Sequence, residues 1–255
     1  MTTLTPSSLS AALRDDLLAL ADTKLVLGNW YAECVINGRS LPDFAAMLGM
    51  SSAQYGHARA LYQFIASFGD DYATLERGRG REDIRSLELL DRAPGSWEDF
   101  LAAIWLAELS SWTFASRYLH HADRTLAGIV RKIGQEVYFH LKYVDGWVRV
   151  LQELPERRAA FVQSVNQRLP LALAWFGRDG EDAAYAEGDA ALPGSALRER
   201  FVQELAPTLK LVGIDQVPAS TADHRADWRS DARRHGAMPE GIYEVVRFKH
   251  QELAH

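Results

Sequence analysis

Polar residues interrupt the apolar stripes of four segments with helical periodicity, and these residues are the ones that could do chemistry. Lys24 lies on the first stripe, Gln54 and His57 on the second, Glu108 on the third and His140 on the fourth. The other members of each stripe are apolar and recur at steps of three and four residues, which places them on one helix face toward a core. A buried carboxylate with imidazoles could bind a metal ion, whereas a buried lysine and glutamate could form an ion pair.

In an antiparallel hairpin, residues equally far before and after the turn lie at the same level along the helix axes. This relation places the polar residues of the first two segments. The turn is centred near residue 39 or 40. The level of Gln54 and His57 on the second segment then maps onto Lys24 on the first. The first hairpin therefore carries its polar residues at one shared level.

The same reflection applies to the third and fourth segments, whose turn is centred near residue 122. Glu108 maps onto Glu136, which is followed by Val137 and, one turn later, by His140. Glu136 leans only partly toward the core, since its Cα is offset from that of Val137 by about a hundred degrees. Because a buried polar group needs partners, we expect the two hairpins to share one polar layer.

Two interpretations of this layer differ in whether it holds a metal. We expect Lys24 and Glu108 to form a buried ion pair, and His57 and His140 to be core histidines with hydrogen-bond partners rather than ligands. Glu33 could supply a further carboxylate, but it sits close to the turn and roughly 15 Å from the layer along the helix axis. We expect it to be out of reach.

Helical periodicity dominates the whole chain, and no segment alternates as a strand would, which predicts an all-α fold. Ser40 with Asp43, Ser96 with Asp99, and Asp123 have the spacing of helix N-caps. Residues 69–95 form a long crossover between two hairpins, as in a ferritin-like four-helix bundle with additional C-terminal helices. We expect helices over about 8–37, 40–68, 96–119, 123–154, 156–176 (kinked at Pro170), 195–210 and 240–255.

We expect one ferritin-like helical domain over residues 1–255, with a core bundle at about 8–154 and peripheral helices at about 156–255. The acidic stretch 177–194 is expected to be a surface loop. The arginines of the run 77–81 are expected in a solvated loop, although they could meet a phosphate or an acidic partner. The remaining histidines are expected to be solvated: His120, His121, His224, His235, His250 and His255.

Composition excludes several classes of protein. The net charge is −6 and the sequence pI is about 5.8, so the chain lacks the basic field that nucleic-acid binding needs. Its one cysteine, Cys34, excludes an internal disulfide framework and fits a reducing cytoplasm. No apolar run is long enough to span a membrane, and no secretory signal is recognisable. We expect a soluble cytoplasmic protein.

Four short motifs carry a resemblance to a known family. Leu25-Val-Leu-Gly, Gly56-His-Ala-Arg, Tyr138-Phe-His-Leu and Asp145-Gly-Trp resemble the bacterial phenylacetyl-CoA ring epoxidase, and within it the C-type subunit. The resemblance covers most of residues 10–175. It implies a ferritin-like fold similar to that of the catalytic, metal-bearing A-type subunit, without a metal site.

The ligand pattern of ferritin-like di-iron proteins is a Glu and then a Glu-x-x-His from each hairpin. Here Lys24 stands in place of the first Glu, Gln54 precedes His57, and Val137 precedes His140. Together with Glu108 and Glu136, these residues would form a vestigial di-iron layer. The resemblance therefore implies no catalytic residue, no metal and no cofactor in this chain.

The resemblance also implies a partner, namely a homologous metal-bearing catalytic subunit of an oxygenase complex. We expect the interface on the first hairpin, where Trp30 and Leu48 need cover, and a possible homodimer through the same face in isolation; Trp175 and Trp228 could also sit at an interface. Two alternatives remain. One is a free-standing oxidase with an atypical metal site, and the other is a helical interaction protein unrelated to oxygenases. The metal site of the first alternative would be built from His57, Glu108, Glu136 and His140.

Overall fold

The computed structural model of the chain describes residues 9–215, 228–231 and 233–247. Within these ranges the regular elements are helices, without a β-strand, and the prediction of an all-α fold is confirmed. The helices are α1 (Ala11–Cys34), α2 (Leu41–Ala66), α3 (Trp97–Ala115), α4 (Arg124–Gln152), α5 (Pro155–Trp175), α6 (Ala183–Ala186), α7 (Gly194–Leu211) and α8 (Glu240–Val246). Short turns of helix are η1 (Val35–Asn37), η2 (Thr74–Gly78), η3 (Glu88–Leu90), η4 (Ser116–Tyr118) and η5 (Asp179–Glu181). None of the described helices is both long and apolar enough to cross a membrane.

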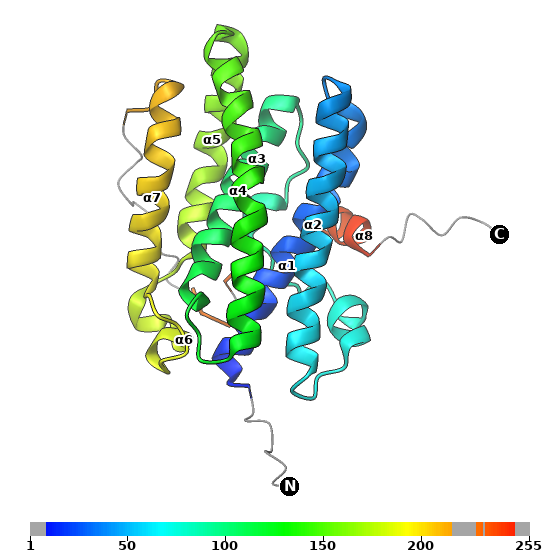
Figure 1. The fold of residues 1–255 in the computed structure, drawn as a ribbon, viewed down its shortest axis with the longest axis vertical. Helices are drawn as coiled ribbons and strands as arrows, with labels where there is room; N and C mark the ends of the chain where they lie inside the picture. The colour runs from blue at the N-terminus through cyan, green and yellow to red at the C-terminus, as the bar shows by residue number, and fades with distance from the viewer. Residues whose placement is uncertain (1–8, 216–227, 232, 248–255) are drawn as a thin grey trace, which may run out of the picture.

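Two antiparallel hairpins, α1–α2 and α3–α4, make the four-helix bundle (Figure 1). The expected caps start three of these helices. Ser40 Oγ accepts from the backbone N–H of Asp43 at 3.3 Å, and Ser96 Oγ accepts from that of Asp99 at 3.1 Å. Asp123 Oδ1 accepts from the first turn of α4. Each cap satisfies a backbone donor that the helix itself leaves free, which fixes where the helix begins.

α3 is the helix at the centre of the molecule. Every residue of α3 is buried except Trp112, which is half-buried. α1 and α4 cover one side of α3, and α5 covers another with Phe161, Val165 and Leu169. The Trp105 and Phe161 rings lie 5.9 Å apart between α3 and α5. α5 is therefore continuous with the bundle core.

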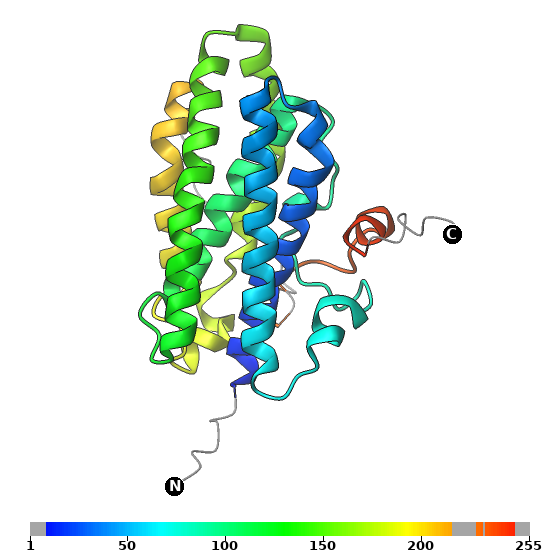
Figure 2. The same cartoon turned by 45° about the vertical axis from the view of Figure 1, so that its right-hand side comes forward.

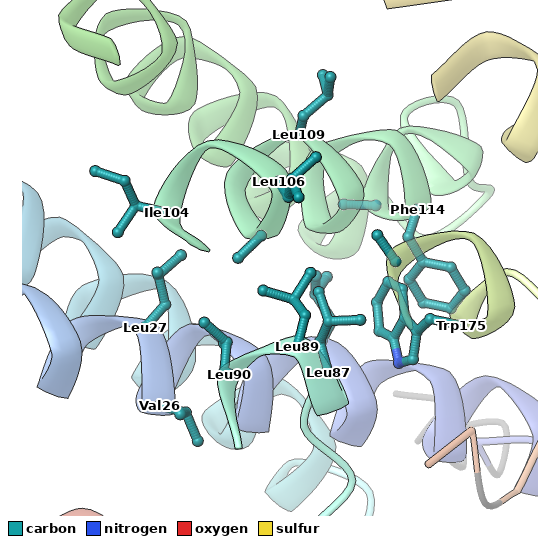
Figure 3. Close-up of a cluster of buried hydrophobic side chains, with 14 of the residues drawn as sticks. Val26, Leu27, Leu87, Leu89, Leu90, Ile104, Leu106, Leu109, Phe114 and Trp175 are labelled. Atoms are coloured by element: carbon teal, nitrogen blue, oxygen red, sulfur yellow. The ribbon is translucent and has the colours of Figure 1, made fainter. Parts of the chain in front are cut away.

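The crossover between the hairpins contributes to the same core. Leu87, Leu89 and Leu90 are buried, and they point into the space between α1 and α3 (Figure 3). The indole N–H of Trp30 donates to the backbone oxygen of Leu90 at 2.9 Å. The expectation that Trp30 lies at an exposed interface is therefore wrong, because the crossover itself covers this side chain.

Trp175 and Trp228, also considered as interface residues, are buried as well. The ring of Trp175 packs at a tilt against that of Phe114 of α3, with ring centroids 4.6 Å apart. The guanidinium of Arg233 lies over the Trp228 ring at 5.2 Å. Both tryptophans thus belong to the contacts that join the C-terminal part of the chain to the bundle.

A buried ionic network anchors the stretch 177–194, expected to be a surface loop. The stretch contains α6 and buries Asp182, Ala184 and Ala190, while residues 185–188 remain exposed. Asp182 caps α6 and accepts from Arg117 at 2.7 Å. Arg117 also donates to Asp16 of α1 at 2.6 Å, and Arg233 donates to the same carboxylate at 2.8 Å. All four side chains are almost fully buried, so each charge depends on the others for compensation.

The arginines at residues 77–81 differ in their exposure to solvent. Arg77 is 79 % exposed, as expected for a solvated loop. Arg79 is only 10 % exposed and donates to Asp22 of α1, whose side chain is fully buried. The expectation of a solvated loop is therefore wrong for Arg79, because a buried carboxylate on α1 requires a cation from the crossover.

Of the histidines expected to be solvated, His120 and His235 are exposed and His121 is half-buried; His224, His250 and His255 lie outside the described residues.

Candidate functional site

The centre of the candidate site is an ion pair between the two hairpins. Lys24 Nζ of α1 lies 3.2 Å from Glu108 Oε2 of α3, and neither side chain is exposed. Burial lowers the pKa of Lys24, and the Glu108 carboxylate opposes that shift. Burial would by itself raise the pKa of Glu108, but the charges of Lys24 and His140 outweigh it and bring that pKa to about 2. The two groups therefore compensate each other inside the core.

The other oxygen of Glu108 accepts three hydrogen bonds. Gln54 Nε2 donates to Oε1 at 2.7 Å, His140 Nδ1 lies 2.7 Å away, and the Tyr31 hydroxyl donates at 3.0 Å. The groups that surround this one carboxylate thus come from α1, α2 and α4, while the carboxylate itself belongs to α3. A carboxylate with every oxygen engaged by protein donors is held firmly in its ionised form.

A second carboxylate–imidazole pair lies at the edge of this layer. His57 Nε2 of α2 is 2.7 Å from Glu136 Oε2 of α4, and Lys132 Nζ donates to the other oxygen of Glu136 at 2.6 Å. His57 is 3 % exposed, whereas Glu136 is 31 % exposed. Glu136 therefore leans toward the layer from its rim, as its offset on the helix predicted.

Two atoms of the layer are buried without a hydrogen-bond partner in the described part of the chain. They are the side-chain oxygen of Gln54 and Nδ1 of His57. Burial and the charge of Lys24 lower the pKa of His57 to about 4. His57 is thus a neutral imidazole at physiological pH, and its free lone pair is on Nδ1.

The structure brings together all the residues that the stripes placed at one level. Val137 lies buried between Glu136 and His140 on α4, where its apolar side chain cannot be a ligand. Glu33 is exposed near the end of α1, outside the layer, as the helix rise predicted. Tyr31 was missed as a member, because a tyrosine on an apolar stripe resembles any other core aromatic. The signal for it was its spacing, two turns beyond Lys24 on the same face.

The donor set does not fit a di-iron centre. Two ferrous ions carry four positive charges and need several carboxylates, whereas here an ammonium group and a single carboxylate occupy the middle of the layer. Among the described residues, no three His, Cys, Asp or Glu side chains gather in an arrangement that could hold a metal ion. The atypical site of His57, Glu108, Glu136 and His140 is therefore divided into two separate pairs.

Comparison with known proteins agrees with the motifs. Residues 1–249 match the family model described as phenylacetic acid catabolic protein. The chain is similar to the C-type subunit of 1,2-phenylacetyl-CoA epoxidase from Escherichia coli (strain K12), with 24% identity over 212 residues, covering 82% of this chain and 84% of that protein. The chain belongs to the phenylacetic acid catabolic protein family.

Proposed function

We propose that this chain is a structural, non-catalytic subunit of a cytoplasmic multicomponent oxygenase that acts on phenylacetyl-CoA in aromatic degradation. Membership of the family and the similarity to the C-type subunit of the epoxidase support the pathway and the complex. One observation carries the non-catalytic role, namely the buried Lys24 ammonium group 3.2 Å from Glu108. This cation occupies the place where a di-iron centre would need negative charge.

The polar layer is then a degenerate di-iron site. Lys24, Gln54 and Val137 replace the three carboxylates that the ligand pattern requires, while His57, Glu108 and His140 remain. The internal contacts of the layer use the remaining groups for packing and charge balance. These groups hold the two hairpins together and serve no reaction of the chain itself.

The function of such a chain would then be to bind and stabilise a homologous metal-bearing subunit through its surface. The tip and outer face of the first hairpin carry exposed apolar side chains that support this: Ile36 (81 %), Leu41 (80 %), Leu48 (46 %) and Phe44 (39 %). A permanent interface of this kind usually buries more than about 2,000 Å² with an apolar centre. In the absence of the partner, the same face would form a homodimer.

Two measurements test the proposal. After expression in iron-supplemented medium, we expect iron well below one atom per chain, and we expect the chain to co-sediment at micromolar concentration with the metal-bearing homologue from the same cell. Iron near two atoms per chain would favour the free-standing oxidase. If the chain sediments as a monomer and does not bind the homologue, the structural role is left without support.

A further inference from the structure

The outer face of α4 carries a row of positive charges. α4 contains five arginine and lysine residues against two acidic ones, in a chain whose net charge is −6. Four of the cations are exposed and share one face, because their spacing of seven or eleven residues returns to the same side of a helix: Arg124, Arg131, Lys142 and Arg149. Lys142 has Asp145 at 3.6 Å, whereas the three arginines have no salt-bridge partner among the described residues. Such a row, about 38 Å long, favours an acidic partner.

Two exposed aromatic side chains lie near the middle of this row. Tyr138 is 57 % exposed and Phe139 is 69 % exposed, with ring centroids 5.3 Å apart. Phe139 lies one turn before Tyr143, whose hydroxyl donates to Asp43 of α2 at 2.9 Å, so the Phe139 ring faces the α2 side of α4. Exposed rings among charged residues are typical of the centre of a protein interface, where a partner covers them.

The flank of α2 beside these rings is lined by small residues. α4 and α2 run side by side on the outside of the molecule (Figure 2). Five alanines and glycines of α2 recur at steps of three and four residues, and each is at least half-exposed or open to solvent: Ala46, Gly49, Ala53, Gly56 and Ala60. This small-residue strip lies on the α4 side, because Ala53 is one turn before His57, which contacts α4. A Cβ at Gly49 or Gly56 would meet nothing within 4 Å, so another helix could approach the strip closely.

This face is separate from the surface of the first hairpin proposed for the metal-bearing homologue. Leu48 of that surface lies one turn before Ser51, whose hydroxyl donates to the backbone oxygen of Gly28 of α1 at 2.8 Å. Leu48 is therefore on the α1 side of α2, whereas Ala53 is on the α4 side. A second copy of this chain does not fit the face of α4, because a two-fold contact would bring the basic rows of the two copies together.

We propose that the outer face of α4 and the small-residue strip of α2 bind an acidic amphipathic helix of a second partner protein. The apolar side of that helix packs on Phe139 and on the strip, and its carboxylates pair with Arg131, Lys142 and Arg149. A partner helix with acidic residues at intervals of seven meets several of these cations at once. Exposed ion pairs contribute little individually, so the charges select and orient the partner while the rings supply the apolar contact.

Photocrosslinking in the cell that makes this chain identifies the partner. The crosslinking residue p-benzoylphenylalanine takes the place of Phe139, and mass spectrometry of the crosslinked peptides identifies the segment in contact. We expect an acidic segment with helical periodicity from a protein other than this chain and the metal-bearing homologue. A neutral or basic segment, a second copy of this chain, the homologue, or no protein crosslink would each overturn the proposal.

The matched control carries the same crosslinking residue in place of Leu48, where the homologue is proposed to bind. We expect crosslinks to the homologue from position 48 and to the acidic segment from position 139. A failure at position 48 contradicts the proposed function alone, and a failure at position 139 contradicts the inference drawn here alone.

Fluorescence anisotropy with a designed acidic helix tests the chemistry of the face. The labelled peptide has four heptads, with leucine at the core positions and glutamate at the flanking positions. We expect saturable binding that weakens about tenfold in the double variant Arg131→Met/Lys142→Met. Gly49→Leu should weaken it as much by filling the strip, while the high helix propensity of leucine keeps α2 folded. Arg77→Met removes an exposed charge elsewhere and should change the affinity by less than about twofold.

Three results of these titrations would overturn the acidic helix as the occupant. They are equal weakening by Arg77→Met and by the double variant, equally tight binding of the peptide with lysine in place of every glutamate, and no binding at millimolar concentration. Vesicles of phosphatidylglycerol form a further arm. Binding to these vesicles that is tighter than binding to the peptide, and that is lost in the double variant, would show a membrane surface as the occupant instead.

Discussion

His57 of α2 and Glu136 of α4 meet at 2.7 Å between Nε2 and Oε2, and this contact joins the two hairpins at the rim of the polar layer. Nε2–H donates to the carboxylate, so Nδ1 carries the lone pair, and it has no partner among the described residues. A second proton on Nδ1 would be buried without an acceptor. Burial and the Lys24 charge accordingly keep the pKa of His57 at about 4.

The first prediction is a loss of stability on mild acidification. The pKa of His57 is about 4 in the folded chain and 6.5 without the fold, so the unfolded state binds more protons between these values. His57 makes its full contribution to the free energy of unfolding above pH 6.5, and this contribution is lost as the pH falls toward 4. Between pH 7 and 5 the free energy of unfolding should fall by about 2 kcal/mol from this group. Urea denaturation at several pH values measures it.

The control for this prediction is His57→Gln, which removes the titration and keeps a donor near Glu136. It is needed because burial raises the pKa of Asp91 to about 6, and this group contributes with the opposite sign over the same interval. The difference in slope between the two chains isolates His57. Parallel pH profiles for both chains would contradict a neutral, buried His57.

The second prediction concerns the Lys24–Glu108 pair. Lys24→Met leaves the Glu108 carboxylate buried without its cation and should cost about 3 to 5 kcal/mol. Glu108→Gln should cost a similar amount, although its oxygen can still accept from Tyr31. The double variant should be much less unstable than the sum, because no lone charge remains. Equal and additive losses would exclude the pairing.

The exposed pair Arg200–Glu204 is the matched control for that double-mutant cycle. Its atoms lie 2.9 Å apart, but the side chains are 43 % and 35 % exposed. The coupling energy between Arg200→Met and Glu204→Gln should stay near about 0.5 kcal/mol or below. A coupling as large as that of the buried pair would show that the cycle does not report on burial.

The third prediction separates two arginines of the crossover that are two residues apart. Arg79→Met leaves the fully buried Asp22 without its cation, while the Tyr62 hydroxyl and the backbone N–H of Arg85 still donate to it, and should cost about 3 kcal/mol. Arg77→Met should change the free energy of unfolding by no more than about 0.5 kcal/mol, because that side chain is exposed. Circular dichroism during urea denaturation compares the two. Similar losses for both would refute the assignment.

The fourth prediction restores the carboxylates of a di-iron pattern. Lys24→Glu, Gln54→Glu and Val137→Glu would, together with Glu108, supply the four glutamates of the ligand pattern beside His57 and His140. We expect about two iron atoms per chain by elemental analysis and a melting temperature that depends on iron. A folded triple variant without iron would mean that the layer does not descend from a di-iron arrangement.

The control for this restoration moves one carboxylate along the same stripe. Val130→Glu in place of Val137→Glu keeps the added charge but displaces it by two turns, or about 10 Å. This variant should fail to bind iron. Its loss of stability from burying glutamates should be similar to that of the first triple variant. Equal iron content in both triple variants would point to binding outside the layer.

Much of this layer could be predicted from the sequence, because the spacing of Lys24, His57, Glu108 and His140 fixes both face and depth on straight helices. Periodicity could not reveal contacts made from irregular segments. Arg79 pairs with Asp22 on a distant part of the chain, and the cover over Trp30 comes from the crossover, whose path depends on tertiary packing. Such contacts are determined by the tertiary packing of the whole core, so no local sequence pattern predicts them.

The Lys24 ammonium group has a consequence for how the chain matures. A metal-filled layer becomes neutral only after ions arrive, so its folding depends on the supply of iron in the cell. Here the balancing charge is covalently part of α1 and enters the core together with the helix that carries it. We therefore expect the bundle to close without waiting for a metal ion, at low iron supply as well as at high.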